Sequence, residues 1–276
     1  MFIVFDIGGS KMRLAASQDG KNISRPKIIP TPQNFSAAIA EFKTMAAELS
    51  NGAKITAVAG GIAGPLDDTK SMILNAHNLP DWNLKPFKKE IEKTVKAPVV
   101  IENDAAVFGL GEATRGAGTG KKIVAYITVS TGVGGSRIVN GAIDNRAVSF
   151  EPGQQLIDPQ KTLCPECVGA GTLENLVSGG ALKKRFGKSP VEIKDAQIWE
   201  QLAEWLAYGL NNTIVHWSPD ILILGGPMLW GKPAISLERV RFHLKNILKI
   251  FPELPEIKAS QLKDLGGLYG ALELLK

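Results

Sequence analysis

The sequence has little cysteine and no long apolar run, and each lack excludes a class of protein. Its 276 residues include 2 cysteines, which are too few for the disulfide framework of a small secreted domain. No stretch approaches the roughly 18 apolar residues that a membrane-spanning helix needs. The opening apolar run has neither the basic flank nor the cleavage site of a secretory signal. We therefore predict a cytoplasmic protein without a membrane partner.

The chain also lacks the common nucleotide-binding motifs and a concentrated charge of one sign. Neither a GxxxxGK[ST] loop nor a GxGxxG turn between a strand and a helix is present. Lys and Arg number 32 against 27 Asp and Glu, a net charge of +5. These charges are scattered, and the lysines between residues 85 and 96 alternate with acidic and apolar residues, as on a solvated helix face. We therefore predict no nucleic-acid partner.

Two glycine-rich hairpins, at residues 2–16 and 123–139, stand out in the sequence. Each combines an apolar strand, a predicted Gly-Gly-Ser-basic turn and a second strand. Glycine permits a positive φ and lets backbone N–H groups approach an anion closely. One such segment is usually only a turn. Two of them, each with a hydroxyl and a cation at the same offset, predict a duplicated fold that holds a polyphosphate between its halves.

Strand and helix patterns alternate along the rest of the chain. Helical spacing of apolar residues occurs at 35–50, 85–96 and 192–217, and short apolar runs end in glycine turns. This alternation favours an α/β sheet with helices on both faces. The 44% apolar content allows two domains of ordinary size. Residues 116–121 are the predicted boundary, and a glycine turn at 266–270 opens a final helix.

A few polar residues have the chemistry that phosphoryl transfer requires, namely an anion cradle, a magnesium ligand and a base. Asp6 ends the first strand, where its carboxylate could bind Mg²⁺ or simply cap the turn. Ser10 and Lys11 could bind phosphate, although surface lysines are common. Asp104 is the candidate base at the start of a helix, whose dipole keeps it ionised. Asn103 and Asp104 could equally be only a helix cap.

The two cysteines, Cys164 and Cys167, have the spacing of half a zinc site. Zinc takes four ligands, and the chain has no second cysteine pair. His77, His216 and His243 lie far away in the sequence. We therefore predict no filled zinc site.

Taken in order, the motifs resemble those of a known family over nearly the whole chain. They are residues 6–11 (DIGGSK), 61–67 (GIAGPLD), 78–82 (NLPDW), 102–105 (ENDA), 130–136 (STGVGGS), 151–154 (EPGQ), 171–174 (GTLE), 219–226 (PDILILGG) and 266–271 (GGLYGA). The series resembles the ROK family of bacterial sugar kinases and repressors, within the actin-like ATPase superfamily. A series in order is far more specific than any one motif.

The resemblance implies an α/β fold of duplicated, ribonuclease H-like domains with a cleft between them. The N-terminal domain would span residues 1–116 and receive a returning C-terminal helix at about 264–276. The larger C-terminal domain would span 117–263 and carry the second phosphate hairpin. ATP and a hexose would bind in the cleft, with Mg²⁺ as the metal ion. The family also suggests a homodimer.

The resemblance further implies a role for each matched residue. The residues around the phosphates would be Asp6, Gly8, Gly9, Ser10, Lys11, Thr131, Gly132, Gly134 and Gly135, with Asp6 at the magnesium ion. Gly225 and Gly226 would lie beside the adenosine. Asp104 would be the catalytic base. The sugar contacts would be Gly64, Asn78, Asn103, Asp104, Glu151, Gln154 and Glu174.

The sequence departs from the family pattern at the zinc ligands. Gln154 stands where the family usually has a histidine that contacts the sugar and binds zinc. Thr172 replaces the third cysteine, Cys167 matches the second, and Cys164 is displaced by one position. We therefore regard Cys164 and Cys167 as remnants and expect no structural zinc. Apolar packing and backbone hydrogen bonds would hold residues 140–172, and the 141–151 stretch lacks the family's usual glycines.

The predicted function is ATP- and Mg²⁺-dependent phosphorylation of a hexose hydroxyl, at the 6-position of glucose or a related sugar. The resemblance allows three alternatives, and the first of them is disfavoured. A repressor would carry a helix-turn-helix before the first hairpin, and Asp6 follows the first methionine too closely for one. A sugar-binding protein with little activity would explain the eroded zinc segment. A kinase could also use polyphosphate as donor, or N-acetylhexosamine or fructose as acceptor.

Overall fold

In the computed structural model the chain forms two α/β units, and the structure describes residues 1–76, 78–144 and 146–276. Unit 1 comprises Met1–Gly116, Asp264–Lys276 and, among the described residues, 146–149. Unit 2 comprises Ala117–Asp144 and Phe150–Lys263. Each unit contains one five-stranded sheet, so the predicted α/β class is confirmed. Within the described residues, no helix combines the length and the apolar character needed to cross a membrane.

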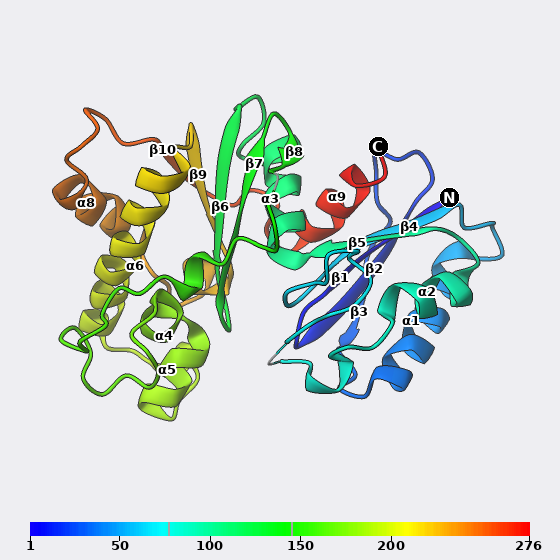
Figure 1. Cartoon of the computed structure of the whole chain (residues 1–276), viewed down its shortest axis with the longest axis horizontal. Helices are drawn as coiled ribbons and strands as arrows, with labels where there is room; N and C mark the ends of the chain where they lie inside the picture. The colour runs from blue at the N-terminus through cyan, green and yellow to red at the C-terminus, as the bar shows by residue number, and fades with distance from the viewer. Residues whose placement is uncertain (77, 145) are drawn as a thin grey trace. The chain divides into compact units, whose positions relative to one another are not determined.

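The sheet of unit 1 has the strand order β3-β2-β1-β4-β5 (Figure 1). Its strands are β1 (Phe2–Ile7), β2 (Lys11–Ser17), β3 (Lys27–Pro30), β4 (Ala57–Ile62) and β5 (Val99–Asn103). The β1–β2–β3 meander is antiparallel, whereas β1, β4 and β5 run parallel. The three parallel strands therefore end at one edge of the sheet, where crossover connections leave room for a site.

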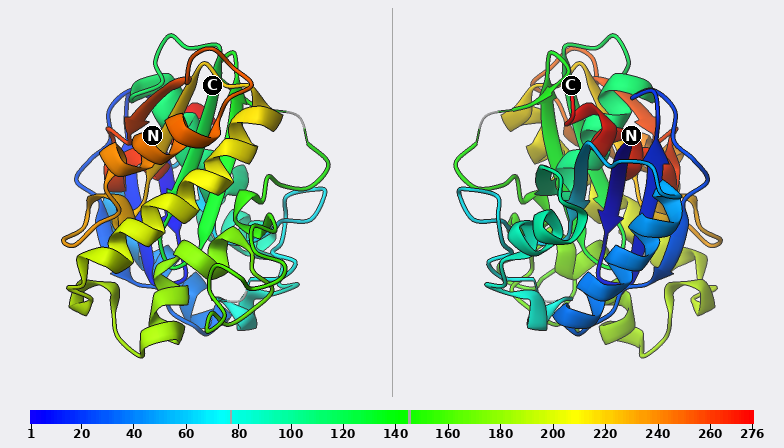
Figure 2. Two further views of the ribbon diagram at one scale, coloured as in Figure 1. Left: turned by 90° about the vertical axis from the view of Figure 1, so that its left-hand side faces the viewer. Right: turned by 90° about the vertical axis from the view of Figure 1, so that its right-hand side faces the viewer.

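Helices cover both faces of this sheet, because side chains along a strand alternate between its faces. The helices are α1 (Phe35–Ser50), α2 (Phe87–Val95), α3 (Asp104–Arg115) and α9 (Gly266–Glu273). Phe5 in β1 packs against Phe42 of α1 and Phe87 of α2, with ring centroids 5.5 and 5.8 Å away. The next residue along the strand toward the N-terminus, Val4, packs on the opposite face with Val107 of α3. The right panel of Figure 2 shows α1 lying over the strands.

The sheet of unit 2 has the order β10-β9-β6-β7-β8. Its strands are β6 (Ile123–Val129), β7 (Val133–Val139), β8 (Ala142–Ile143), β9 (Ile221–Gly225) and β10 (Glu256–Ala259). Its helices are α4 (Leu173–Val177), α5 (Gly179–Phe186), α6 (Ala196–Trp217), α7 (Pro227–Trp230) and α8 (Leu237–Ile247). Leu206 and Leu210 of α6 pack in one apolar core with Ile127 of β6. The left panel of Figure 2 shows α6 lying along the sheet.

Two element boundaries differ from the sequence predictions. The long helix begins at Ala196 rather than near residue 192, because the side chain of Asp195 accepts the Gln197 N–H and caps it. The glycines of residues 266–270 lie inside α9 rather than in a turn before it. They permit close packing, since a Cβ on Gly270 would collide with the Val107 carbonyl of α3.

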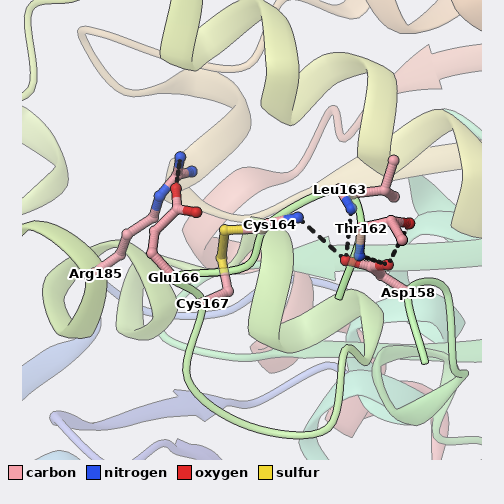
Figure 3. Close-up of a disulfide and its surroundings, with 7 residues drawn as sticks. All are labelled: Asp158, Thr162, Leu163, Cys164, Glu166, Cys167 and Arg185. Carbon is pink, nitrogen blue, oxygen red and sulfur yellow. Dashed lines mark hydrogen bonds and ion pairs between the residues drawn. A yellow bond between two sulfur atoms is a disulfide. The ribbon is translucent and has the colours of Figure 1, made fainter. Parts of the chain in front are cut away.

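The irregular segment between β8 and α4 contains a disulfide between Cys164 and Cys167 (Figure 3). Both cysteines are buried. The carboxylate of Asp158 accepts the N–H groups of Thr162, Leu163 and Cys164 at 2.7, 2.9 and 3.1 Å. The expected apolar packing and backbone hydrogen bonds are therefore supplemented by a disulfide and a side-chain carboxylate, neither of which was predicted. Nothing in the local pattern distinguished a disulfide from a remnant of metal ligands.

Candidate active site

Three candidate residues of unit 1, Asp6, Asn103 and Asp104, lie where its parallel strands end. The register pairs Asp6 of β1 with Gly61 of β4, and Gly61 with Glu102 of β5. Asn103 and Asp104 follow directly at the start of α3. A Cβ on Gly61 would lie 2.9 Å from the Cα of Asp104. The sheet thus brings Asp6 and Asp104 to one edge although they are far apart in the sequence.

Asn103, not Asp104, is the cap of α3. Its side-chain oxygen accepts the Ala106 N–H at 3.2 Å, and its amide nitrogen donates to the Gly64 carbonyl at 3.2 Å. Asp104 is the first residue of the helix, half-buried, and its Oδ1 accepts the Ala105 N–H at 2.8 Å. The structure therefore brings together Gly64, Asn103 and Asp104, three of the predicted sugar contacts. The sequence alone did not distinguish the two residues, and the structure assigns the cap of α3 to Asn103.

Asp6 is buried inside unit 1 and forms an ion pair with Arg13. Its relative exposure is 2%, and its Oδ2 lies 2.8 Å from Nη1 of Arg13 in the neighbouring strand. Burial raises the pKa of Asp6 to about 7, against the opposing charge of Arg13 and with the help of the negative charge of Asp104. Asp6 therefore lies within the strand and is not a turn cap.

The residues at this edge fit a magnesium ion. Carboxylate oxygens are the donors that Mg²⁺ prefers, and it usually takes one or two of them and completes its shell with water and substrate phosphate. Asp6 and Asp104 repel each other electrostatically, and a cation would relieve that repulsion. Among the described residues no group of three or more metal-binding side chains occurs, so the protein would supply only this small share of the ligands.

The first hairpin turn consists of Gly8, Gly9 and Ser10 between β1 and β2. The Gly8 N–H donates to the Lys11 carbonyl at 3.0 Å, which closes the turn. Neither Gly8 nor Gly9 has a φ in the left-handed range. The prediction of a positive φ in this turn is therefore wrong. Close approach explains Gly9 instead, because a Cβ there would lie 2.5 Å from the Cβ of Asn78. The predicted sugar contact Asn78 thus lies against the predicted phosphate turn.

The second hairpin contains the same Gly-Gly-Ser-basic motif, but the motif lies in a strand rather than in the turn. Its turn is formed by Ser130, Thr131 and Gly132, whereas Gly134 and Gly135 lie in β7. Arg137 donates to the Trp217 carbonyl at 3.0 Å and pairs with Asp144. The prediction that the Gly-Gly-Ser-basic residues form the turn is therefore wrong for the second hairpin, where they lie in β7. The paired strands themselves are present as predicted.

The predicted adenosine contacts, Gly225 and Gly226, lie at the same end of the unit 2 sheet as this turn. Gly225 ends β9 opposite Thr128 of β6. Gly226 has φ 95°, and a Cβ there would collide with the Val129 carbonyl. Only glycine meets both demands without strain.

The first residues of α5 contact the turn at residues 130–132, and no predicted site residue lies in α5. The N–H of Gly179 donates to the Ser130 carbonyl at 2.8 Å, and that of Gly180 to the Thr131 carbonyl at 3.0 Å. Ser178 caps α5 by accepting the Ala181 N–H. The signal was available in the sequence as a capping serine followed by two glycines.

Gln154 and Glu174 approach each other in unit 2. The Glu174 carboxylate accepts the Val133 N–H at 2.9 Å and the Gln154 amide at 3.5 Å. Glu174 lies in the first turn of α4, which Thr172 caps through its side-chain oxygen. Thr172, which the family resemblance matched to a zinc-ligand position of the relatives, stabilises a helix terminus in this chain. Glu151 is exposed and directly precedes the short 3₁₀ turn Pro152–Gln154.

Three of the candidate zinc ligands have other partners in the structure. Cys164 and Cys167 pair with each other, and His243 lies 2.8 Å from Glu200. His77 lies outside the described residues. The absence of stoichiometric zinc stays a prediction.

Comparisons with known proteins agree on one family. The sequence model of the ROK family matches residues 2–276. A glucokinase of Streptomyces coelicolor is 28% identical over 98% of this chain and 96% of its own length. An N-acetyl-D-glucosamine kinase of Escherichia coli is 28% identical over 98% of both chains.

The fold of this chain also resembles that of a solved ROK family structure. A ROK family glucokinase from Streptomyces griseus, crystallised with glucose and AMPPNP, is 27% identical to this chain. It superposes with a TM-score of 0.82 over 99% of this chain and 98% of its own. The predicted fold, that of the actin-like ATPases, is confirmed. Because the family model covers almost every residue, the chain belongs to the ROK family.

Proposed function

We propose that the protein is a kinase that transfers the γ-phosphoryl group of ATP to the 6-hydroxyl of glucose or a closely related hexose. The observation that carries this proposal is the cluster of Gly64, Asn103 and Asp104 beside Asp6 at one edge of the unit 1 sheet. An acceptor hydroxyl needs a carboxylate within reach and a cation-binding group nearby. The relatives named glucokinase support the choice of sugar.

In the proposed reaction Asp104 accepts the proton of the attacking hydroxyl. The start of α3 orients this carboxylate, and Asn103 can present its second amide hydrogen to a sugar oxygen. Late proton removal makes orientation more important than basicity in a loose phosphoryl transition state. Mg²⁺ held near Asp6 would neutralise charge on the transferring group.

The nucleotide would contact groups of both units. In unit 1 these are the N–H groups of Gly9 and Ser10 and the side chain of Lys11. In unit 2 they are the turn of Thr131 and Gly132 and the Gly225–Gly226 step. Glu151, Gln154 and Glu174 would accept or donate hydrogen bonds to sugar hydroxyls, which suits carboxylates and amides.

A coupled assay of ADP release tests the proposal. ATP and Mg²⁺ would be offered with glucose, mannose, fructose, glucosamine and N-acetylated hexosamines. We expect the highest kcat/KM with glucose or its nearest relative. An N-acetylhexosamine as best acceptor would revise the sugar, since one relative is named for that activity. A parallel arm with polyphosphate tests the donor, and no turnover in any arm would contradict a kinase.

A further inference from the structure

Glu102, the last residue but one of β5, is a buried carboxylate at the centre of a charged cluster. Its relative exposure is 3%. Its Oε1 accepts the Asn103 N–H at 2.8 Å and the guanidinium of Arg146 at 2.6 Å. Its Oε2 accepts the ammonium of Lys70 at 2.6 Å. Both oxygens of this carboxylate are therefore engaged directly beside the proposed sugar-binding residues.

Lys70 reaches Glu102 from a tightly built turn. The carboxylate of Asp67 accepts the N–H groups of Ser71 and Met72 at 2.6 and 2.7 Å. Lys70 itself has φ 49°, a left-handed conformation that a lysine adopts only when its surroundings require it. Gly64, which receives the Asn103 amide, lies at the start of the same loop. The turn thus aims one cation at the end of β5.

Arg146 reaches Glu102 from a segment whose sequence neighbours belong to unit 2. Residues 146–149 group with unit 1, while the chain on either side, up to Asp144 and from Phe150, groups with unit 2. The side chain of Arg146 is only 11% exposed. Glu151, a proposed sugar contact, follows five residues later. The ion pair therefore attaches the segment that leads to Glu151 to the strand that leads to Asp104.

We propose that Glu102 is a positioning residue for the acceptor sugar, acting through Asn103 on one side and through Arg146 on the other. This inference rests on the proposed function. Removal of one partner from a buried ion pair leaves an uncompensated charge, which forces local rearrangement. The planar guanidinium of Arg146 also fixes direction in a way that a lysine does not. Loss of the pair should therefore impair sugar binding more than nucleotide binding.

The test compares Glu102→Gln and Arg146→Gln with the wild type. Gln keeps an acceptor for the Asn103 N–H but loses the charge that holds Arg146 and Lys70. We expect KM for the best sugar to rise about tenfold in each variant, with KM for ATP within twofold. The double variant should be no worse than either single one, because both remove the same interaction. Arg146→Lys should recover part of the loss.

Arg115→Gln is the matched control. Arg115 forms a partly buried ion pair in unit 1 with Glu273, and the side-chain exposures are 20% and 10%. It lies at the opposite end of α3 from Asp104, so its loss should cost stability without changing KM for sugar. A change of less than fivefold in KM for sugar in the folded Glu102 and Arg146 variants overturns the proposal. Equal changes in Arg115→Gln overturn it as well.

Two further measurements keep the outcome decisive. If Glu102→Gln does not fold, Arg146→Gln decides by the same fivefold threshold. Hydrogen exchange at residues 146–149 should accelerate in the Glu102 variant and not in the Arg115 control.

If the wild type phosphorylates no sugar, the proposed function fails, and so does the proposed role of Glu102 in sugar binding. Hydrogen exchange in the Glu102 variant would then still show whether Glu102 holds residues 146–149 in place.

Discussion

At the scale of single residues, Asp104 is the side chain on which the proposed chemistry depends most. Asp104→Asn should lower kcat at least about 10²-fold, the lower end for loss of a general base. The fold should survive, because Asn103 supplies the cap of α3. Steady-state assays with circular dichroism measure both. Turnover near the wild-type value would exclude Asp104 from the mechanism.

Asp195→Asn is the control for that substitution. It makes the same change of carboxylate to amide at the start of another helix, where Asp195 caps α6. Asn caps as well as Asp, so both kcat and stability should stay close to those of the wild type.

Asp6 should make the stability of the protein depend on pH. Its pKa is raised from 3.8 to about 7 by burial, so between these values the folded state binds more protons than the unfolded chain. The free energy of unfolding should therefore fall as pH rises from about 4 to 7. The contribution between pH 5 and 8 is roughly 3 kcal/mol, at 1.36 kcal/mol per pKa unit.

Urea unfolding of the wild type and Asp6→Asn in metal-free buffer measures this contribution. Asn cannot ionise but can still accept from Arg13. The free energy of unfolding of the wild type minus that of the variant should decrease from pH 5 to pH 8. A difference that does not change with pH would show that Asp6 titrates in its ordinary range.

At the scale of elements, the disulfide turn before α4 is the feature that most changes the sequence-based interpretation. The four-residue loop closed by Cys164 and Cys167 is small, so chain entropy predicts a stabilisation of only about 2 kcal/mol. Replacement of both cysteines by alanine should lower the free energy of unfolding by about that amount. Dithiothreitol should have the same effect on the wild type and none on the variant.

We also predict that this segment binds no structural zinc. Two thiols do not complete a tetrahedral site, and Gln154 offers a neutral, hard oxygen in place of an imidazole nitrogen. We expect far less than one zinc per chain in protein purified without a metal-binding tag. About one zinc per chain by elemental analysis, with free thiols, would contradict both this prediction and the disulfide.

At the scale of the whole molecule, ligands should stabilise the fold in proportion to their affinity. A ligand at 100 times its Kd adds about 2.7 kcal/mol to the free energy of unfolding. A thermal-shift screen should therefore raise Tm by several degrees with the true sugar, and further when a non-hydrolysable ATP analogue and Mg²⁺ are added. Sugars that the assay of ADP release rejects serve as controls. The absence of a shift with any sugar would contradict a hexose site.

The sequence by itself determined the α/β class, the paired hairpins and the family. These follow from local patterns, since alternation of apolar residues, glycine spacing and motif order are visible along the chain. Local pattern also indicated that Asn103 and Asp104 begin a helix. It did not decide which of them caps it, because both side chains can accept the same N–H groups.

Only the tertiary structure decided which charges meet and which glycines are confined. Glu102 meets Lys70 and Arg146, which are 32 and 44 residues away, and no local spacing encodes such pairs. The two Gly-Gly-Ser segments have the same sequence, yet one forms a turn and the other lies in a strand. The pairing of the strands decides where each hairpin reverses. The raised pKa of Asp6 likewise arises from burial. Burial is a property of the packed fold, which is why the sequence pattern alone could not predict it.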